Sequence, residues 1–193
     1  MPLRLASAAA ALALMAAAGP TLAQSQDAPI ATAGTAAESV EARNAREAIA
    51  YATPLPRGAP EQDYPLVAWC AALVEGHVAL GQTLTDADDL DREIMRLGGL
   101  EATDFREALR IGAARQTPAT RAAAQAAAAE ASAKWTPLMA QSDERARSEA
   151  FGLFFGLPGR CEHAARRVRE NITTPPETLD EAGLDETGQP KAN

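Results

Sequence analysis

The sequence predicts an all-α protein, a small up-and-down bundle of about five to six helices with disordered ends. Two stretches carry apolar or unusual residues at steps of three and four, the spacing of a helix that buries one face. The first stripe consists of Leu66, Cys70, Leu73, His77, Leu80 and Leu84, and the second of Ala150, Phe154, Leu157, Cys161, Ala164 and Val168. No segment shows the alternation of a β-strand. We expect the bundle domain to span residues 61–171.

Residues 1–23 indicate a secretory signal peptide. Arg4 supplies positive charge, residues 5–18 are an unbroken run of Ala, Leu, Met and Ser, and a small-x-small site ends at Ala23. This pattern predicts export and cleavage after Ala23. No cysteine lies near that point, so we do not expect a lipoprotein. Later segments do not have the length and apolarity of a membrane span, and none is predicted.

The mature chain is expected to be acidic. Arg4 is the only charged residue of the signal, so 17 basic residues face 26 acidic ones and the net charge is −9. That sign argues against nucleic acid as a partner. Arginine outnumbers lysine 16 to 2 and alanine is abundant, which suggests a bacterium with a GC-rich genome. The predicted location is therefore the periplasm.

Residues 24–60 are predicted to be a flexible linker with one short helix. The capping box Thr35-Ala-Ala-Glu38 predicts a helix over residues 36–51, and its weak apolar face indicates loose docking. Three prolines within residues 54–60 then predict an extended spacer.

Start and stop signals predict the bundle helices in order. The expected helices are residues 64–83, one capped by Thr85 and ended by Gly98-Gly99, one starting at Asp104 with Glu107, one from Thr117-Pro118 through Trp135, one from Thr136-Pro137 to about Leu157, and one from Cys161 to Asn171. Pro158-Gly159 either kinks or ends the helix before it. Residues 172–193 are acidic and rich in Pro, Thr and Gly, which predicts a disordered tail.

Cys70 and Cys161 are predicted to form a disulfide, because an exported protein with only two cysteines normally pairs them. The bond requires Cα atoms within about 7 Å, so it would place the first and last bundle helices side by side. Closing the loop between them is worth about 4–5 kcal/mol in the chain-entropy model. The alternative is two buried, unlinked cysteines.

His77 is the candidate pocket residue. It shares a stripe with Cys70 and so faces the core, either as a buried neutral histidine or as a ligand or base in an internal pocket. His163 follows Cys161 by two positions and points nearly to the opposite side of its helix, so we expect it to matter little for stability. The cysteines and histidines therefore do not converge as a zinc site.

Other candidate groups have simpler explanations. A C-x-x-C-H motif is absent, which excludes covalent haem, although haem held by His77 with Met95 or Met139 remains an alternative. Four aspartates at residues 86–91 lack the remaining features of a calcium loop and suit a helix N-terminus. The arginines at positions 160, 166, 167 and 169 are expected to form a solvated face, and contact with an anionic partner is the alternative.

The sequence shows no G-x-S-x-G, H-E-x-x-H or C-x-x-C motif. We therefore predict no catalytic residues, no metal ligands and no cofactor. The protein is predicted to be a non-enzymatic, exported module that binds an unidentified protein or small-molecule partner or supports the cell envelope. The alternative is a small cofactor- or metal-binding bundle protein, or an enzyme, that uses His77 in an internal pocket.

Overall fold

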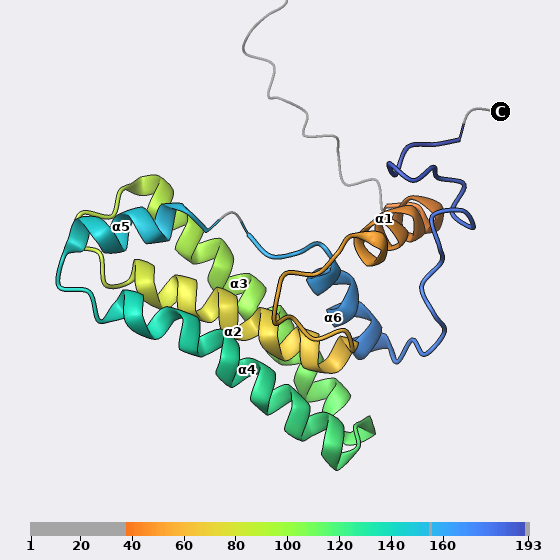
Figure 1. Ribbon diagram of the computed structural model, residues 1–193, viewed down its shortest axis with the longest axis horizontal. Helices are drawn as coiled ribbons and strands as arrows, with labels where there is room; N and C mark the ends of the chain where they lie inside the picture. The colour runs from red at the N-terminus through yellow and green to blue at the C-terminus, as the bar shows by residue number, and fades with distance from the viewer. Residues whose placement is uncertain (1–37, 155, 192–193) are drawn as a thin grey trace, which may run out of the picture. The chain divides into compact units, whose positions relative to one another are not determined.

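The computed structural model describes residues 38–154 and 156–191. Over these residues the chain forms six α-helices, a short 3-10 helix and no β-strand, which confirms the predicted all-α class (Figure 1). The helices are α1 (Val40–Ala52), α2 (Asp63–Gly81), α3 (Asp89–Gly112), α4 (Pro118–Met139), α5 (Glu144–Gly152) and α6 (Arg160–Glu170), with the 3-10 helix at Ala113–Arg115. The signal peptide predicted over residues 1–23 lies outside the described residues.

Helix α2 is the centre of the bundle. It packs against α3, α4 and α6, and Figure 1 shows it running between them. The predicted stripe is buried from Leu66 to Leu80, and Leu84 is half-buried just beyond the helix end. Side chains on the other faces, including Val67, Trp69 and Val74, are buried as well. A helix that is apolar all round is one that other helices surround, and α2 fits this rule.

The apolar character of α2 has a second consequence. By length and composition alone it could cross a membrane, because it has 19 residues and its most apolar 18-residue window has a mean hydropathy of 1.2. The prediction that no segment after the signal has this character is therefore wrong. In the structure 72% of the most apolar part of α2 is buried inside the bundle, which is the environment of a core helix.

Helix α3 is one continuous helix, whereas two were predicted. Asp88 caps it, accepting from the backbone N–H of Asp91, while Thr85 instead bonds Glu144. Gly98-Gly99 does not end the helix. A Cβ on Gly98 would lie 2.8 Å from Val78 Cγ2, so this glycine allows α2 and α3 to approach closely.

Helix α4 also continues through a predicted break. Thr117 caps its start as expected, accepting from the N–H of Thr120. Thr136-Pro137 does not begin a new helix, because Pro137 lies in the last turn, where losing one backbone hydrogen bond interrupts little. Asp143 caps α5 instead, accepting from the N–H of Arg145.

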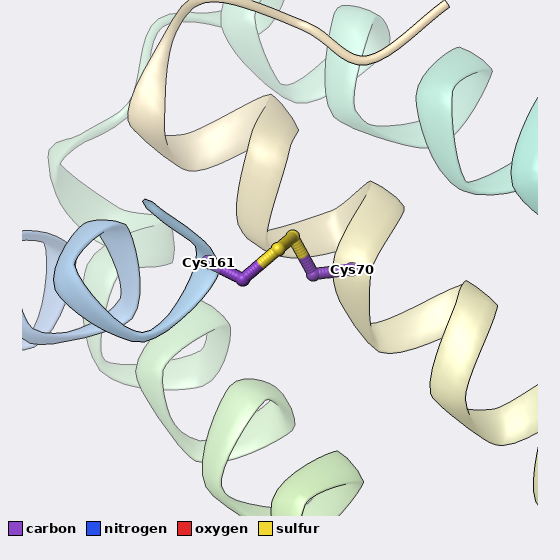
Figure 2. Close-up of a disulfide and its surroundings, with 2 residues drawn as sticks. All are labelled: Cys70 and Cys161. Carbon is purple, nitrogen blue, oxygen red and sulfur yellow. A yellow bond between two sulfur atoms is a disulfide. The ribbon is translucent and has the colours of Figure 1, made fainter. Parts of the chain in front are cut away.

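The break at Pro158-Gly159 is complete. Helix α5 ends at Gly152 and α6 begins at Arg160. The second apolar stripe is therefore divided among α5, the connection that contains Phe154 and Leu157, and α6, and its regular spacing is coincidental. Helix α6 is bonded to α2 by the predicted disulfide. Cys70 and Cys161 are both buried, their Cα atoms are 6.1 Å apart, and Figure 2 shows the bond crossing between the two helices.

Both ends of the described chain are better ordered than predicted. Helix α1 begins four residues after the expected start, is capped by Ser39 rather than Thr35, and is docked firmly, because Glu47 and Ala48 are buried against the bundle. The segment from 172 to 191 lacks helices but follows hydrogen-bonded turns, with Leu184 buried and bridged to Pro190. Its composition predicts disorder, whereas the structure packs it beside α1.

We expect the double substitution Cys70→Ala, Cys161→Ala to lower the free energy of unfolding by about 4–5 kcal/mol. The reason is that the unfolded chain regains the freedom of a loop that spans 91 residues. Urea unfolding measures the difference. Reductant is the matched control, since it should destabilise the wild type and leave the double variant unchanged. Equal stability of both proteins would contradict the crosslink.

Two glycine substitutions should act in opposite directions. A Cβ on Gly76 would lie 2.0 Å from Trp135 Cδ1, so Gly76→Ala should cost about 1–3 kcal/mol through overpacking. A Cβ on Gly99 meets nothing within 4 Å, so Gly99→Ala should stabilise α3 by roughly 0.5–1 kcal/mol. Thermal unfolding of the two variants tests the packing directly, and a stabilising Gly76→Ala would refute it.

Candidate binding cleft between α1 and α6

His77 lies in an aromatic cluster built by α2, α4 and the end of α5. Its Nε2 donates to the carbonyl oxygen of Phe151 at 2.9 Å, because a carbonyl can only accept. Its ring stacks on that of Phe151 at a centroid distance of 4.3 Å and lies 4.4 Å from Phe154 and 5.8 Å from Trp135. Burial lowers the pKa of His77, and the bond to Phe151 opposes this only in part. The imidazole is therefore neutral at pH 7.

This environment does not fit haem ligation by His77. The Nε2 atom already has a partner, and Phe151 and Phe154 lie against the ring. Met139, one of the two methionines considered as a second ligand, is exposed at the end of α4. His77 lines none of the clefts described below.

A buried ionic cluster joins α1 to α6. Glu47 of α1 is 5% exposed and Arg167 of α6 is 6% exposed, and Glu47 Oε1 accepts from Arg167 Nη1 at 2.7 Å. The second carboxylate oxygen of Glu47 accepts from Arg166. Arg167 also donates to Asp63 at the start of α2, at 3.0 Å, and to the carbonyl oxygen of Thr174. Two carboxylates thus balance two guanidinium groups.

The cluster extends through Tyr51. Its hydroxyl donates to Asp63 Oδ1 at 2.5 Å, and the Arg160 guanidinium lies over its ring at 4.2 Å. Burial, followed by the bond to Asp63, raises the pKa of Tyr51, so the phenol stays protonated. Burial opposes the charge of Arg167, but its bonds to Glu47 and Asp63 outweigh this and raise its pKa.

A cleft of about 300 Å³ lies beside this cluster. One wall is the last two turns of α1, a second is the start of the proline spacer, and the third is the first turn of α6. Apolar side chains form most of the surface, and basic groups lie among them. The lining residues are Arg46, Ile49, Ala50, Thr53, Pro54, Leu55, Pro158, Gly159, Arg160, Glu162 and His163.

His163 is the most buried polar group of the cleft, with 4% of the residue exposed. Its nearest ionic neighbour is Glu47, whose Oε2 lies 3.9 Å from Nδ1, beyond hydrogen-bond distance. Within the described part of the chain its ring makes no hydrogen bond. Burial lowers the pKa of His163, while Glu162 and Glu47 oppose the shift. His163 points away from Cys161, as the spacing predicts, and α1 lies on that side of α6.

Arg160 lies one turn before His163 on α6. Its guanidinium donates to the carbonyl oxygen of Glu61 and stacks on Tyr51, but its Nε is buried without a hydrogen-bond partner. No carboxylate of the described residues pairs with it. Arg46, at the rim, differs in this respect, because it donates to both oxygens of Glu38 and lies 3.6 Å from Glu162.

Two other clefts are larger but chemically different. One of about 420 Å³ between the start of α3 and α5 is lined largely by carboxylates. Another of about 350 Å³ at the start of α2 is lined mainly by amide, hydroxyl and charged groups. Small-molecule sites are usually apolar cavities with a few well-placed polar groups, and the α1–α6 cleft is closest to that description.

The α1–α6 cleft and the ionic cluster beside it were not predicted from the sequence. The arginines near the end of the chain were predicted to be solvated, but Arg167 is buried and Arg166 largely so. No role was predicted for Glu47, because a single acidic residue on a short helix does not indicate a buried ion pair. The partnership between Glu47 and Arg166-Arg167 depends on α1 and α6 meeting in space, which no spacing along the chain reveals.

The aspartates at residues 86–91 behave as helix-start carboxylates. Asp88 and Asp91 form a capping box, and Asp89 pairs with Arg92. Within residues 38–154 and 156–191, no three His, Cys, Asp or Glu side chains gather as metal ligands would. Comparison with known proteins found no matching family model, no matching curated protein and no matching solved structure.

Glu47→Gln should cost about 3 kcal/mol of unfolding free energy, because Arg166 and Arg167 lose the buried carboxylate that they share and keep only Glu170 and Asp63, respectively. Glu149→Gln is the matched control. It removes the same charge from an exposed pair with Arg145 and should cost under about 1 kcal/mol. Urea unfolding distinguishes them, and similar small effects would show that the cluster does not hold α1.

Stability should fall as the pH drops below about 6.5. Both histidines have a lower pKa in the folded state than in the unfolded state, so the unfolded chain takes up protons first. The loss begins near the unfolded pKa of about 6.5 and continues down to the folded values. Thermal unfolding between pH 8 and pH 5, with NMR titration of the two imidazoles, measures it. Titration of both at or above pH 6.5 would contradict the burial.

Proposed function

We propose that this protein is an exported, non-enzymatic binding module of the bacterial periplasm that holds a small molecule in the α1–α6 cleft. The observation that carries the proposal is the cleft itself, in which mostly apolar side chains lie around His163, a residue that is 4% exposed and whose ring makes no hydrogen bond within residues 38–154 and 156–191. Because His163 lines the cleft, a ligand there can bond its ring nitrogens.

The crosslink supports an oxidising location. Disulfides persist in the periplasm and outside the cell, whereas cytosolic thiols are kept reduced. Cys70–Cys161 is buried at the junction of α2 and α6, as a structural bond would be. Together with the signal-like residues 1–23, it favours export.

The rigid setting of the cleft supports a binding role. Helix α6, whose first turn forms the third wall of the cleft, is bonded to the central helix by the disulfide and to α1 by the ionic cluster. Cavities that bind small molecules are usually largely preformed, because a rigid site loses little entropy when it is filled.

Export is tested by fractionating cells and determining the N-terminus of the recovered protein. We expect the protein in the periplasmic fraction, beginning at Gln24, with both cysteines oxidised. Recovery of the full-length chain in the cytoplasm with free thiols would refute the location.

Binding is tested by adding a chemically diverse set of small fragments to isotope-labelled protein and mapping the NMR shift changes. We expect hits whose changes centre on the cleft. Ala50→Leu, which places a larger side chain in the cleft, should abolish them. Ala126→Leu, the same change at an exposed position on α4, should leave them intact. Absence of any fragment that perturbs the cleft would overturn the proposal.

A further inference from the structure

We infer that the α1–α6 cleft binds a small amphipathic carboxylate, with the carboxylate beside Arg160 and His163 and the apolar part against α1 and the proline spacer. This inference names the ligand class of the proposed function and rests on it. Three features of the cleft point to this ligand: basic groups that no carboxylate of the described residues bonds, the N-terminal end of α6, and an apolar wall.

The polar groups come from one face of α6. Arg160 and His163 are three residues apart, the spacing at which side chains on a helix lie side by side. Arg160 is a permanent cation, and its Nε has no partner although it is buried. His163 is 4% exposed and has no hydrogen bond among the described residues. A carboxylate oxygen accepts from guanidinium and imidazole N–H groups alike, so one anion would supply both missing bonds.

The helix end favours the same charge. Gly159, the residue before α6, lies on the cleft wall and provides no side-chain cap for the first turn. The N-terminus of a helix carries partial positive charge and unpaired N–H groups. An anion held by Arg160 and His163 would therefore lie beside a helix N-terminus.

The carboxylates near the cleft are otherwise engaged. Glu38 accepts two hydrogen bonds from Arg46, and Glu162, which is largely exposed, lies 3.6 Å from the same guanidinium. Glu47 is held by Arg166 and Arg167. None of them pairs with Arg160, which leaves that cation available to an incoming anion.

The remaining wall requires an apolar group. Ile49, Ala50, Pro54, Leu55 and Pro158 also line the cleft and offer no side-chain hydrogen bond. The cleft volume of about 300 Å³ corresponds to roughly ten water molecules, which suits a ligand of about ten non-hydrogen atoms. An inorganic anion would leave this wall uncovered, and a hydrocarbon would leave Arg160 and His163 unpartnered.

Calorimetry with phenylacetate, phenylacetamide and acetate tests the inference on the intact protein. Phenylacetate has both parts, phenylacetamide lacks only the charge, and acetate lacks only the ring. We expect phenylacetate to bind with a Kd on the order of 10 µM to 1 mM. The other two should bind at least tenfold more weakly, the usual effect of losing a charge-assisted hydrogen bond or a buried ring.

Variants show whether binding occurs at this site. Arg160→Met should weaken phenylacetate binding about tenfold and leave phenylacetamide unchanged. Arg145→Met is the control for net charge, because Arg145 is an exposed arginine on α5. Since Arg160 also bonds Glu61, folding of the variant is checked by thermal unfolding, and His163→Phe provides a second variant. The His163 ring nitrogens should show the largest NMR shift changes when phenylacetate is added.

The outcomes separate this inference from the proposed function. Equal binding of phenylacetate and phenylacetamide would overturn the carboxylate assignment and leave a binding cleft. Tight binding of acetate would overturn the requirement for an apolar part. Loss of affinity in Arg145→Met as large as in Arg160→Met would place the anion elsewhere. If no compound perturbs the cleft while fragments of other chemistry do, the ligand class is wrong and the binding function stands.

Discussion

The attachment of α6 to the rest of the bundle is the constraint on which this structure depends. Six of its eleven residues are charged, so the apolar face with which α6 joins the core is narrow and consists of Cys161, Ala164, Ala165 and Val168. On one side Cys161 is bonded to Cys70 of the central helix. On the other side Arg166 and Arg167 are paired with Glu47 of α1. A helix of this composition would otherwise be better solvated alone, because transferring its charges from water is costly.

The two attachments differ in what they contribute. The disulfide removes freedom from the unfolded chain and so adds to net stability. The ionic cluster adds less to net stability, because the free-energy cost of burying two carboxylates and two guanidinium groups nearly cancels their electrostatic attraction. Its effect is on specificity. Arg167 finds acceptors on α1, on α2 and at Thr174 only when all three are correctly placed, so the cluster selects one position for α1 and the following tail.

Sequence spacing predicted the parts of the fold that depend on one helix at a time. The stripe from Leu66 to Leu80 identified the core helix, and the presence of only two cysteines identified the crosslink. Sequence spacing did not predict the features that depend on contacts between helices. In the sequence Gly98 is typical of a helix end, but in the structure it allows α2 and α3 to pack closely.

The same limit applies to the candidate site. His77 was identified because it lies on an apolar stripe, yet its aromatic neighbours and its bond to Phe151 make it part of the core. His163 was set aside because it faces away from Cys161. Its surroundings are decided by α1, whose docking depends on Glu47, and that long-range pairing leaves no periodic trace in the chain. The cleft was therefore beyond what spacing alone could predict.

The cleft lies where α1 is attached to α6 through the charges of Glu47, Arg166 and Arg167, with Ala48 as its one buried apolar residue. Protein interiors are normally filled to the density of organic crystals, and an alanine-rich chain has few side chains large enough to do so. Glu47 fixes α1 against the middle of α6, and the proline spacer leads the chain away from the first turn of α6, leaving a gap between them. A merely structural gap would be expected to contain apolar groups only. This one also contains the Arg160 guanidinium and the His163 imidazole, which are polar groups that a ligand in the cleft can reach.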